Sequence, residues 1–166
     1  MKWTAYTDGA CAPSNPGPAG WGAVVIAPDG KTETDHWGFI GHGTNQIAEL
    51  TAAIEGLTLV PPGEAVELVS DSQYVLKGLM EWRSGWERRG FRNSKGEAVA
   101  NLGLWKKLFA LADARRVTTR WVRGHNGDWH NERADALANR ALALRANGWA
   151  TAAERDEPRQ DGLSSS

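Results

Sequence analysis

The chain opens with residues 2–41, KWTAYTDGACAPSNPGPAGWGAVVIAPDGKTETDHWGFIG, and this stretch decides the fold. Its apolar and β-branched residues fall into three segments typical of β-strands, at residues 2–8, 21–28 and 32–41. A loop rich in proline and glycine separates the first two segments, and Asp29-Gly30 is a strong hairpin signal between the second and the third. We therefore expect the chain to begin with three strands that neighbour one another.

The rest of the chain alternates between helical and strand patterns. Thr44 is a good helix N-cap, and the apolar spacing that follows it predicts a helix up to the Pro61-Pro62-Gly63 stop. The later elements are expected as a strand at 65–70, helices at about 72–80 and 102–113, a strand at 117–124 and a helix at 132–146. Hairpin-linked strands followed by strand–helix alternation predict an α/β fold, in which a mixed sheet carries helices on its faces.

Composition bounds the class of protein. A chain of 166 residues with 41% hydrophobic and 23% charged content is one ordinary globular domain. The net charge of −1 means that any nucleic-acid surface must be a local patch. The single cysteine, Cys11, excludes an internal disulfide and a cysteine-rich zinc site.

Location and domain limits are also expected from the sequence. No apolar run approaches the roughly 20 residues of a membrane span, and the first residues have no signal-peptide pattern, so we expect a cytoplasmic protein. A self-contained domain makes a monomer the default. We expect the domain to cover residues 1–149, and the polar, serine-ending residues 150–166 to form a mobile tail.

Four carboxylates occur where such a fold could gather them: Asp8, Glu49, Asp71 and Asp135. Asp8 ends the first strand and Asp71 ends the fourth, so both emerge at one sheet edge if these strands are parallel neighbours. The other two lie early in helices, beside apolar stripes that face the sheet. Acid groups in one pocket repel each other unless cations lie between them, and oxygen ligands select hard ions such as Mg²⁺ or Mn²⁺. This pattern points to metal-assisted chemistry on phosphates.

Each of these acids also has an ordinary structural explanation. Asp8 could be a turn residue, and Asp71 could cap the helix that follows it. The two helix residues could be surface acids, with the second paired to Arg133 or Asn139. Single positions therefore do not decide between a metal centre and structural roles.

The wider motifs resemble one family closely. They are YTDGAC…NPGPAGWG, TNQIAELTAA, SDSQYV and VRGHNG…NERADALA, in this order, and they resemble the bacterial type 1 ribonuclease H family over about residues 2–145. The resemblance implies a ribonuclease H-like fold, with a five-stranded mixed sheet of strand order 3-2-1-4-5 and helices on both faces. It also implies an endonuclease that hydrolyses the RNA strand of RNA–DNA hybrids.

The resemblance assigns chemical roles as well. It implies that the four carboxylates bind two Mg²⁺ ions, with Mn²⁺ as a substitute, and that the products carry 5′-phosphate and 3′-hydroxyl ends. His125, in a loop with flanking glycines, would be a catalytic proton shuttle or a product-release group, although a lone loop histidine is usually a surface residue. Glu132 would help product release or serve as an ordinary first-turn helix acid.

The resemblance further implies a substrate-binding surface. Asn15, Asn45 and Gln73 match positions that contact the minor groove near the scissile bond, and Thr44 would both cap its helix and reach a DNA phosphate. Residues 77–100 resemble the basic handle of the family, which follows the DNA backbone. In this segment the substrate-binding candidates are Trp82, Trp86, Arg88, Arg89 and Arg92.

The sequence of the handle limits how strongly this surface is expected to bind a hybrid. Three glutamates dilute the handle, namely Glu81, Glu87 and Glu97, so we expect weaker hybrid binding than a lysine-rich handle would give. A solvated helix pair with internal salt bridges is the alternative for this segment. Trp105 and Trp121 lie in regular elements and are expected in the core.

Two other functions compete with hybrid cleavage. One is a catalytically silent hybrid-binding module, against which the intact set of acids argues. The other is a different nuclease of the same fold, such as a transposase or junction resolvase, against which the handle, the loop around His125 and the short chain argue.

Overall fold

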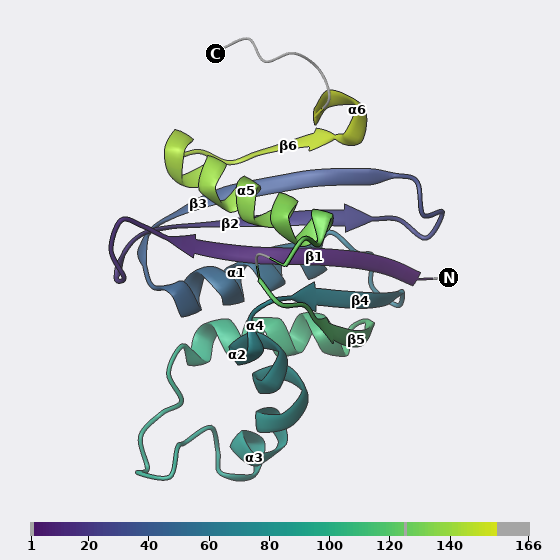
Figure 1. Ribbon diagram of the computed structural model, residues 1–166. Coiled ribbons are helices and arrows are strands. Elements are labelled where there is room, and N and C mark those ends of the chain that lie inside the picture. Colours follow the sequence, from purple (N-terminus) through teal and green to yellow (C-terminus); the bar gives the residue numbers. More distant parts are fainter. Residues whose placement is uncertain (1, 125, 156–166) are drawn as a thin grey trace.

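The computed structural model describes residues 2–124 and 126–155, and in them the strands form one mixed sheet (Figure 1). The strands are β1 (Lys2–Cys11), β2 (Gly17–Ile26), β3 (Glu33–Gly43), β4 (Ala65–Ser70), β5 (Arg116–Trp121) and β6 (Gly148–Thr151). They lie in the order β5-β4-β1-β2-β3-β6. β1 pairs antiparallel with β2 and parallel with β4. The predicted mixed sheet and its 3-2-1-4-5 order are therefore confirmed, with β6 added beside β3.

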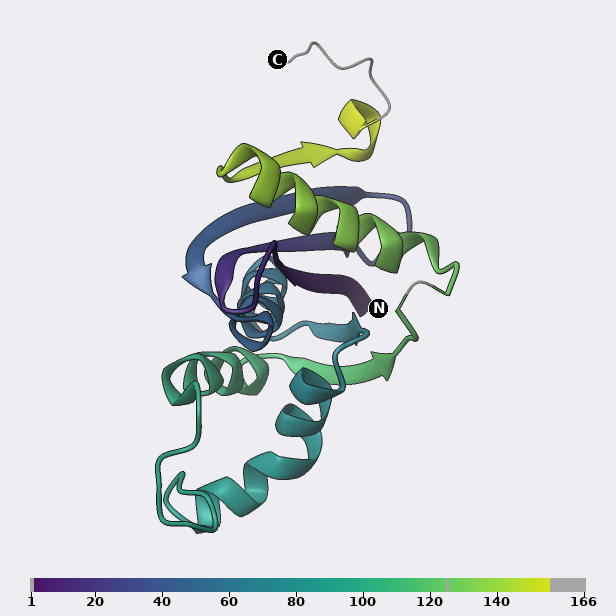
Figure 2. The same ribbon diagram turned by 60° about the vertical axis from the view of Figure 1, so that its left-hand side comes forward.

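Helices cover both faces of this sheet (Figures 1 and 2). They are α1 (Asn45–Thr58), α2 (Gln73–Lys77), η1 (Gly78–Trp82), α3 (Arg83–Arg88), α4 (Leu102–Asp113), α5 (Trp129–Leu144) and α6 (Ala152–Arg155). α1, α2 and α4 pack on one face, and α5 packs on the other. None of the helices in the described part of the chain is long and apolar enough to cross a membrane.

The central strand β1 contributes to the core on both faces. Ala5 packs with α1 and α4, whereas Tyr6, the next residue, packs with α5. Strand side chains alternate between faces, so a central strand covered on both sides buries consecutive residues. Trp105 is fully buried in the larger cluster, as predicted, and its indole Nε1 donates to the Tyr74 hydroxyl over 3.1 Å.

The segment after β4 differs from its predicted form. We expected one helix at about 72–80, but α2 passes into the π-helical turn η1 and then into α3. At Gly78, where η1 begins, an added Cβ atom would collide with the Trp105 ring. The π-helical turn therefore begins where the core tryptophan approaches the helix backbone.

The C-terminal boundary was predicted too early. Residues 150–155 are not a tail: β6 pairs antiparallel with β3, and α6 follows directly. β3 would otherwise present an edge of unpaired backbone groups, and β6 covers part of that edge and buries Ala150. Residues 156–166 lie outside the described residues.

Candidate metal centre

Two of the predicted acids come from neighbouring parallel strands. Tyr6 of β1 pairs with Val69 of β4, so Asp8, two residues further along β1, and Asp71, just after the end of β4, lie at the same end of this strand pair. The chain therefore brings these carboxylates together because β1 and β4 run in the same direction.

Glu49 reaches the same point from α1. The backbone N–H of Gly9 donates to Asp8 Oδ1 and to Glu49 Oε1, each over 3.0 Å. A Cβ atom at residue 9 would collide with the backbone of Ala48. Gly9 thus lets the second turn of α1 lie directly against β1, which brings the Glu49 carboxylate beside Asp8.

The three carboxylates form a compact, oxygen-only cluster. Asp8, Glu49 and Asp71 each offer one oxygen, and these oxygens lie within 4.8 Å of one another. Asp8 is only 4% exposed. Burial, followed by repulsion from Glu49 and Asp71, raises the pKa of Asp8 to about 11. Burial, followed by repulsion from Asp71, raises the pKa of Glu49 to about 8.

Among the described residues, burial and the neighbouring carboxylates raise both pKa values, and no cation is among the causes. Near neutral pH the cluster holds at least one proton that an ordinary carboxyl would release. A dication would replace that proton and remove the repulsion, and hard oxygen donors in this number suit Mg²⁺ or Mn²⁺. The residues present therefore fit a hard divalent metal.

Asp135 joins the cluster from the opposite face. Its side chain hydrogen-bonds to the Asp8 carboxyl, which adds to the rise in the pKa of Asp8. Asn139 Nδ2 donates to the Asp135 backbone oxygen over 3.0 Å. Of the two surface partners considered from the sequence, Asn139 makes contact, whereas Arg133 pairs with Asp35 instead. The fold therefore brings all four predicted acids to one place.

The loop between β5 and α5 lies against the acid cluster at Gly124. A Cβ atom at Gly124 would lie 2.8 Å from Asp71 Oδ2, so the glycine permits a close approach. His125, the predicted proton shuttle, lies outside the described residues. Glu132 Oε2 accepts from the Gly127 N–H over 3.0 Å and so ties the loop to the first turn of α5. Its part in product release stays a prediction.

The predicted groove-binding residues lie on the same edge of the molecule. Asn15 Oδ1 accepts from the Asn45 N–H over 3.1 Å, which joins the loop after β1 to the start of α1. Thr44 Oγ1 accepts from the Ile47 N–H over 3.0 Å, so its predicted N-cap role is confirmed. Gln73 is exposed at the start of α2, two residues after Asp71.

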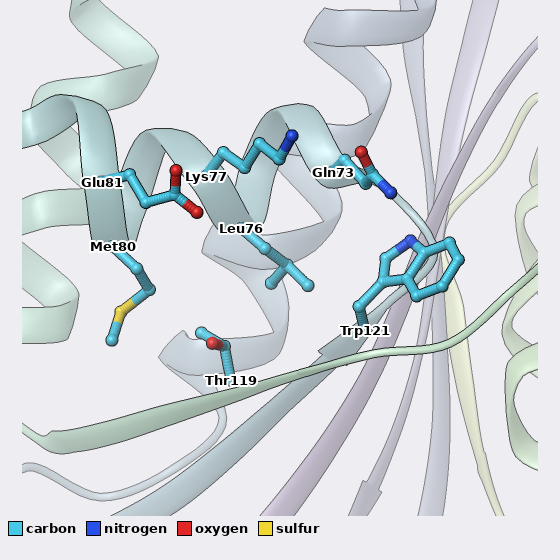
Figure 3. Close-up of a pocket in the computed structure, with 7 residues that line it drawn as sticks. All are labelled: Gln73, Leu76, Lys77, Met80, Glu81, Thr119 and Trp121. Carbon is cyan, nitrogen blue, oxygen red and sulfur yellow. The ribbon is translucent and has the colours of Figure 1, made fainter.

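A hollow of about 260 Å³ adjoins Gln73, between α2, η1 and β5 (Figure 3). Its lining residues are Gln73, Leu76, Lys77, Met80, Glu81, Thr119 and Trp121. The Trp121 indole Nε1 donates to the backbone oxygen of Asp71 over 3.1 Å. The hollow is therefore linked directly to one of the clustered acids.

The predicted core position of Trp121 is wrong, because 46% of the residue is exposed. It ends β5, the edge strand of the sheet, and lines the hollow between β5, α2 and η1. Sequence reasoning missed it as a surface residue. The predicted strand ran on to residue 124 and so placed Trp121 in its interior, whereas β5 ends at Trp121.

The handle projects away from the sheet, as Figure 1 shows for α3. Trp86 packs on Trp105, with 5.1 Å between ring centroids, and Trp82 lies 5.8 Å from Trp86 on the outer side. Arg83 makes two 2.7 Å contacts with Asp113 and so ties α3 to α4. The internally paired alternative therefore applies to Arg83.

The three predicted phosphate-binding arginines behave differently from Arg83. Arg88, Arg89 and Arg92 are exposed, and none forms an ion pair with another described residue. Arg92 instead donates to the Gly96 carbonyl oxygen over 2.8 Å, which shapes the loop after α3. Their charges are thus available to an external anion.

Comparison with known proteins places these features in context. Residues 1–143 match the RNase H family. Ribonuclease H of Alkalilimnicola ehrlichii is 50% identical over 138 residues, which cover 83% of this chain and 92% of that protein. Ribonuclease H of Cupriavidus pinatubonensis is 46% identical over 142 residues, which cover 86% of this chain and 96% of that protein.

Solved structures show the same similarity. LC9-RNase H1, a type 1 RNase H with the type 2 active-site motif, superimposes with a TM-score of 0.80 at 28% identity, covering 99% of this chain and 84% of that one. LC11-RNase H1, solved in complex with an RNA/DNA hybrid, gives a TM-score of 0.60 at 25% identity, covering 86% of this chain and 98% of that one.

Proposed function

This chain belongs to the RNase H family, and we propose that it is an endonuclease that hydrolyses the RNA strand of RNA–DNA hybrids. The observation that carries the proposal is the convergence of Asp8, Glu49, Asp71 and Asp135 from four different elements at one sheet edge. Relatives named Ribonuclease H, and a structural neighbour bound to an RNA/DNA hybrid, support the substrate class.

The acid cluster would hold two Mg²⁺ ions, with Mn²⁺ as a substitute. When bound, such ions activate the attacking water and neutralise the leaving oxygen, which leaves 5′-phosphate and 3′-hydroxyl ends. The protein contributes the negative charge and the fixed spacing. Gly9 holds the Asp8 and Glu49 oxygens in place through its N–H, and Gly124 leaves room beside Asp71. His125 would move a proton at this site, and Glu132 would assist product release through its contact with the loop.

The substrate would cross the edge that carries these acids. Asn15, Asn45 and Gln73 would contact the minor groove, because they are exposed and lie close in the chain to Asp8, Glu49 and Asp71 respectively. Thr44 would reach a DNA phosphate in addition to capping α1. The predicted handle, with Trp82, Trp86, Arg88, Arg89 and Arg92, would follow the DNA backbone.

We extend this surface to the hollow beside Asp71. The Trp121 ring is fixed by its bond to the Asp71 backbone, yet nearly half of the residue faces solvent. Lys77 and Gln73 supply donors at the rim, and Glu81 supplies an acceptor. A sugar or base of the RNA strand next to the scissile bond suits such a mixed polar and aromatic wall better than a phosphate, because Glu81 would repel a phosphate.

The competing functions are less well supported. A silent hybrid-binding module would have no use for a buried cluster of acids whose mutual repulsion raises the pKa of two members. A transposase- or resolvase-like nuclease would act on DNA, whereas the curated relatives are named for ribonuclease activity. The monomeric state and the cytoplasmic location stay predictions.

A strand-resolved cleavage assay tests the proposal. The purified chain is incubated with end-labelled RNA–DNA hybrid, with duplex RNA and with duplex DNA, in Mg²⁺, in Mn²⁺ and in chelator. We expect internal cuts in the RNA strand of the hybrid, only with metal, and none with Asp71→Asn. Asp29→Asn, in a surface hairpin turn, serves as the matched control that keeps activity. Cleavage of duplex DNA, or hybrid binding without cleavage, would favour one of the competing functions.

A further inference from the structure

A second group of charges lies on the other side of the α5 N-terminus, outside the acid cluster. Asp35 of β3 is fully buried, and its Oδ2 accepts from Arg133 Nε and from Arg155 Nε, each over 2.9 Å. Arg155 also reaches Glu33 over 3.1 Å, and its side chain is only 9% exposed. A buried carboxylate held by two guanidinium groups is a rigid junction, because each charge depends on the others for compensation.

The side chains of this junction contact the first two turns of α5. The Arg155 guanidinium lies 5.2 Å from the centre of the Trp129 ring, and Arg133 lies two residues before Asp135. His130 contacts Glu33 over 3.3 Å, and its ring stacks on Tyr6 at 4.8 Å. Side chains on two successive turns of the helix are thus tied to β1, β3 and the C-terminal α6.

The remaining contacts of α5 constrain the position of the helix along its own axis less strongly. The face that it buries against the sheet consists mainly of alanines, namely Ala134, Ala138 and Ala141, with Leu137. At Gly22 of β2, an added Cβ atom would collide with the Ala134 carbonyl, so the helix backbone lies directly on the strand. Small side chains fix the depth of a helix closely, but they interlock little along the axis. The charged junction supplies that missing constraint.

We propose that Arg155 is a positioning residue for the metal centre. Through Asp35 and Arg133 it fixes the axial position of α5, and therefore the position of Asp135 relative to the three acids that come from β1, α1 and β4. The inference rests on the proposed metal-dependent function. It makes Arg155 a support of the site, although its guanidinium contacts Asp35 and Glu33 and not the acid cluster.

Calorimetric titration of substrate-free, full-length protein with Mn²⁺ tests this directly. For Arg155→Ala we expect a Kd raised roughly tenfold, the loss typical of removing a residue that orients a metal ligand. The Mg²⁺ concentration for half-maximal hybrid cleavage should rise in parallel, whereas kcat at saturating Mg²⁺ should stay near that of the wild type. Arg155→Lys keeps the charge but not the planar fork, so it should give a smaller rise.

Glu154→Gln is the matched control. Glu154 is the neighbour of Arg155, is exposed, and accepts from the Thr151 N–H over 2.8 Å, so this change perturbs α6 without touching the junction. An unchanged Mn²⁺ Kd in folded Arg155→Ala, even with a lowered Tm, would reduce Arg155 to a stabilising residue and overturn the proposal. An equal rise in Glu154→Gln would overturn it too. Should Arg155→Ala fail to fold, the Arg155→Lys titration decides between the same outcomes. Wild-type protein that binds Mn²⁺ but cuts no hybrid would instead count against the proposed function.

Discussion

Asp8 is the residue at which stability and function conflict most directly. Its folded pKa of about 11 lies above the ordinary value of 3.8, so the folded state keeps a proton that the unfolded chain releases. The metal-free protein therefore loses stability as pH rises above about 4 toward the folded pKa, because deprotonation favours the unfolded chain. The acids that gather here are a cost of folding that a bound cation would offset.

The substitution Asp8→Asn should accordingly abolish cleavage and stabilise the metal-free fold. An amide keeps the oxygen that accepts from the Gly9 N–H but carries no charge. A gain of 1 kcal/mol would raise Tm by about 2–4 °C in a domain of this size, and we expect at least that at pH 8 in chelator. The gain should shrink at pH 5, where the wild-type unfolded state holds more protons. Scanning calorimetry of both proteins at the two pH values measures it, and a lower Tm for the variant at pH 8 would contradict the cluster's repulsion.

Trp121 carries a separate prediction at the same scale. If its exposed face meets the RNA strand, Trp121→Ala should raise KM for hybrid by about 5- to 150-fold, since stacking on an aromatic side chain contributes about 1–3 kcal/mol. Trp121→Phe should keep much of the affinity. The change in kcat should be small, because the metal-ligating carboxylates are retained. Trp149, which is exposed on β6, offers a control: Trp149→Ala should leave both constants unchanged. Steady-state kinetics with the three variants decide whether the hollow belongs to the substrate surface.

At the scale of elements, the arginines of the handle fall into two groups: one is ion-paired within the protein and the others are exposed. Arg83 forms ion pairs with Asp113 and Glu87 and so anchors α3. Arg88, Arg89 and Arg92 are exposed to solvent. Because each neutralised phosphate contributes about −0.9 to the slope of log K against log salt, three arginines would give a handle contribution of about −2.7. The glutamates interspersed with them keep the total shallow.

The handle prediction can be tested by substitution. Arg88→Ala should make the slope less steep by about 0.9 and weaken binding to all hybrid sequences equally. Arg83→Ala should act differently, because it releases α3 from α4 and should lower Tm as well. Fluorescence anisotropy of labelled hybrid across a salt series, with chelator to prevent cleavage, gives the slopes. A slope unaltered by Arg88→Ala would return the segment to the role of a solvated helix pair.

Elements also show where sequence reasoning succeeds. The strand at 65–70 and the helix at 102–113 were predicted to the residue, because their apolar patterns end at clear polar boundaries. The π-turn at Gly78–Trp82 was missed; it begins at Gly78, where the Trp105 ring, from far along the chain, lies against the helix backbone. The pairing of β6 with β3 was missed for the same reason: residues 148–151 are too few to carry a periodic signal, and their partner is distant.

At the scale of the whole molecule, the sheet order explains why the acids could be predicted and the junction could not. Asp8 and Asp71 follow from strand direction alone, and Glu49 and Asp135 follow from motif context. The roles of Asp35 and Arg155 depend on which strand accepts β6 as a neighbour, and no local pattern states this. Local chemistry therefore predicted the site, whereas long-range contacts determine what supports it.

The stability that a bound metal adds to the folded protein should depend on pH. A dication that enters the cluster must displace the protons held by Asp8 and Glu49, whose pKa values stand at about 11 and about 8. Binding therefore releases protons, so affinity should fall as pH falls and should rise from pH 6 to pH 9. Because the metal binds only the folded state, Tm should climb with Mn²⁺ concentration, and the climb should be steeper at the higher pH. Thermal melts in chelator and in graded Mn²⁺ at pH 6, 7.5 and 9 measure this. Asp8→Asn should abolish most of the rise, and a Tm increase independent of pH would show that the cation binds elsewhere.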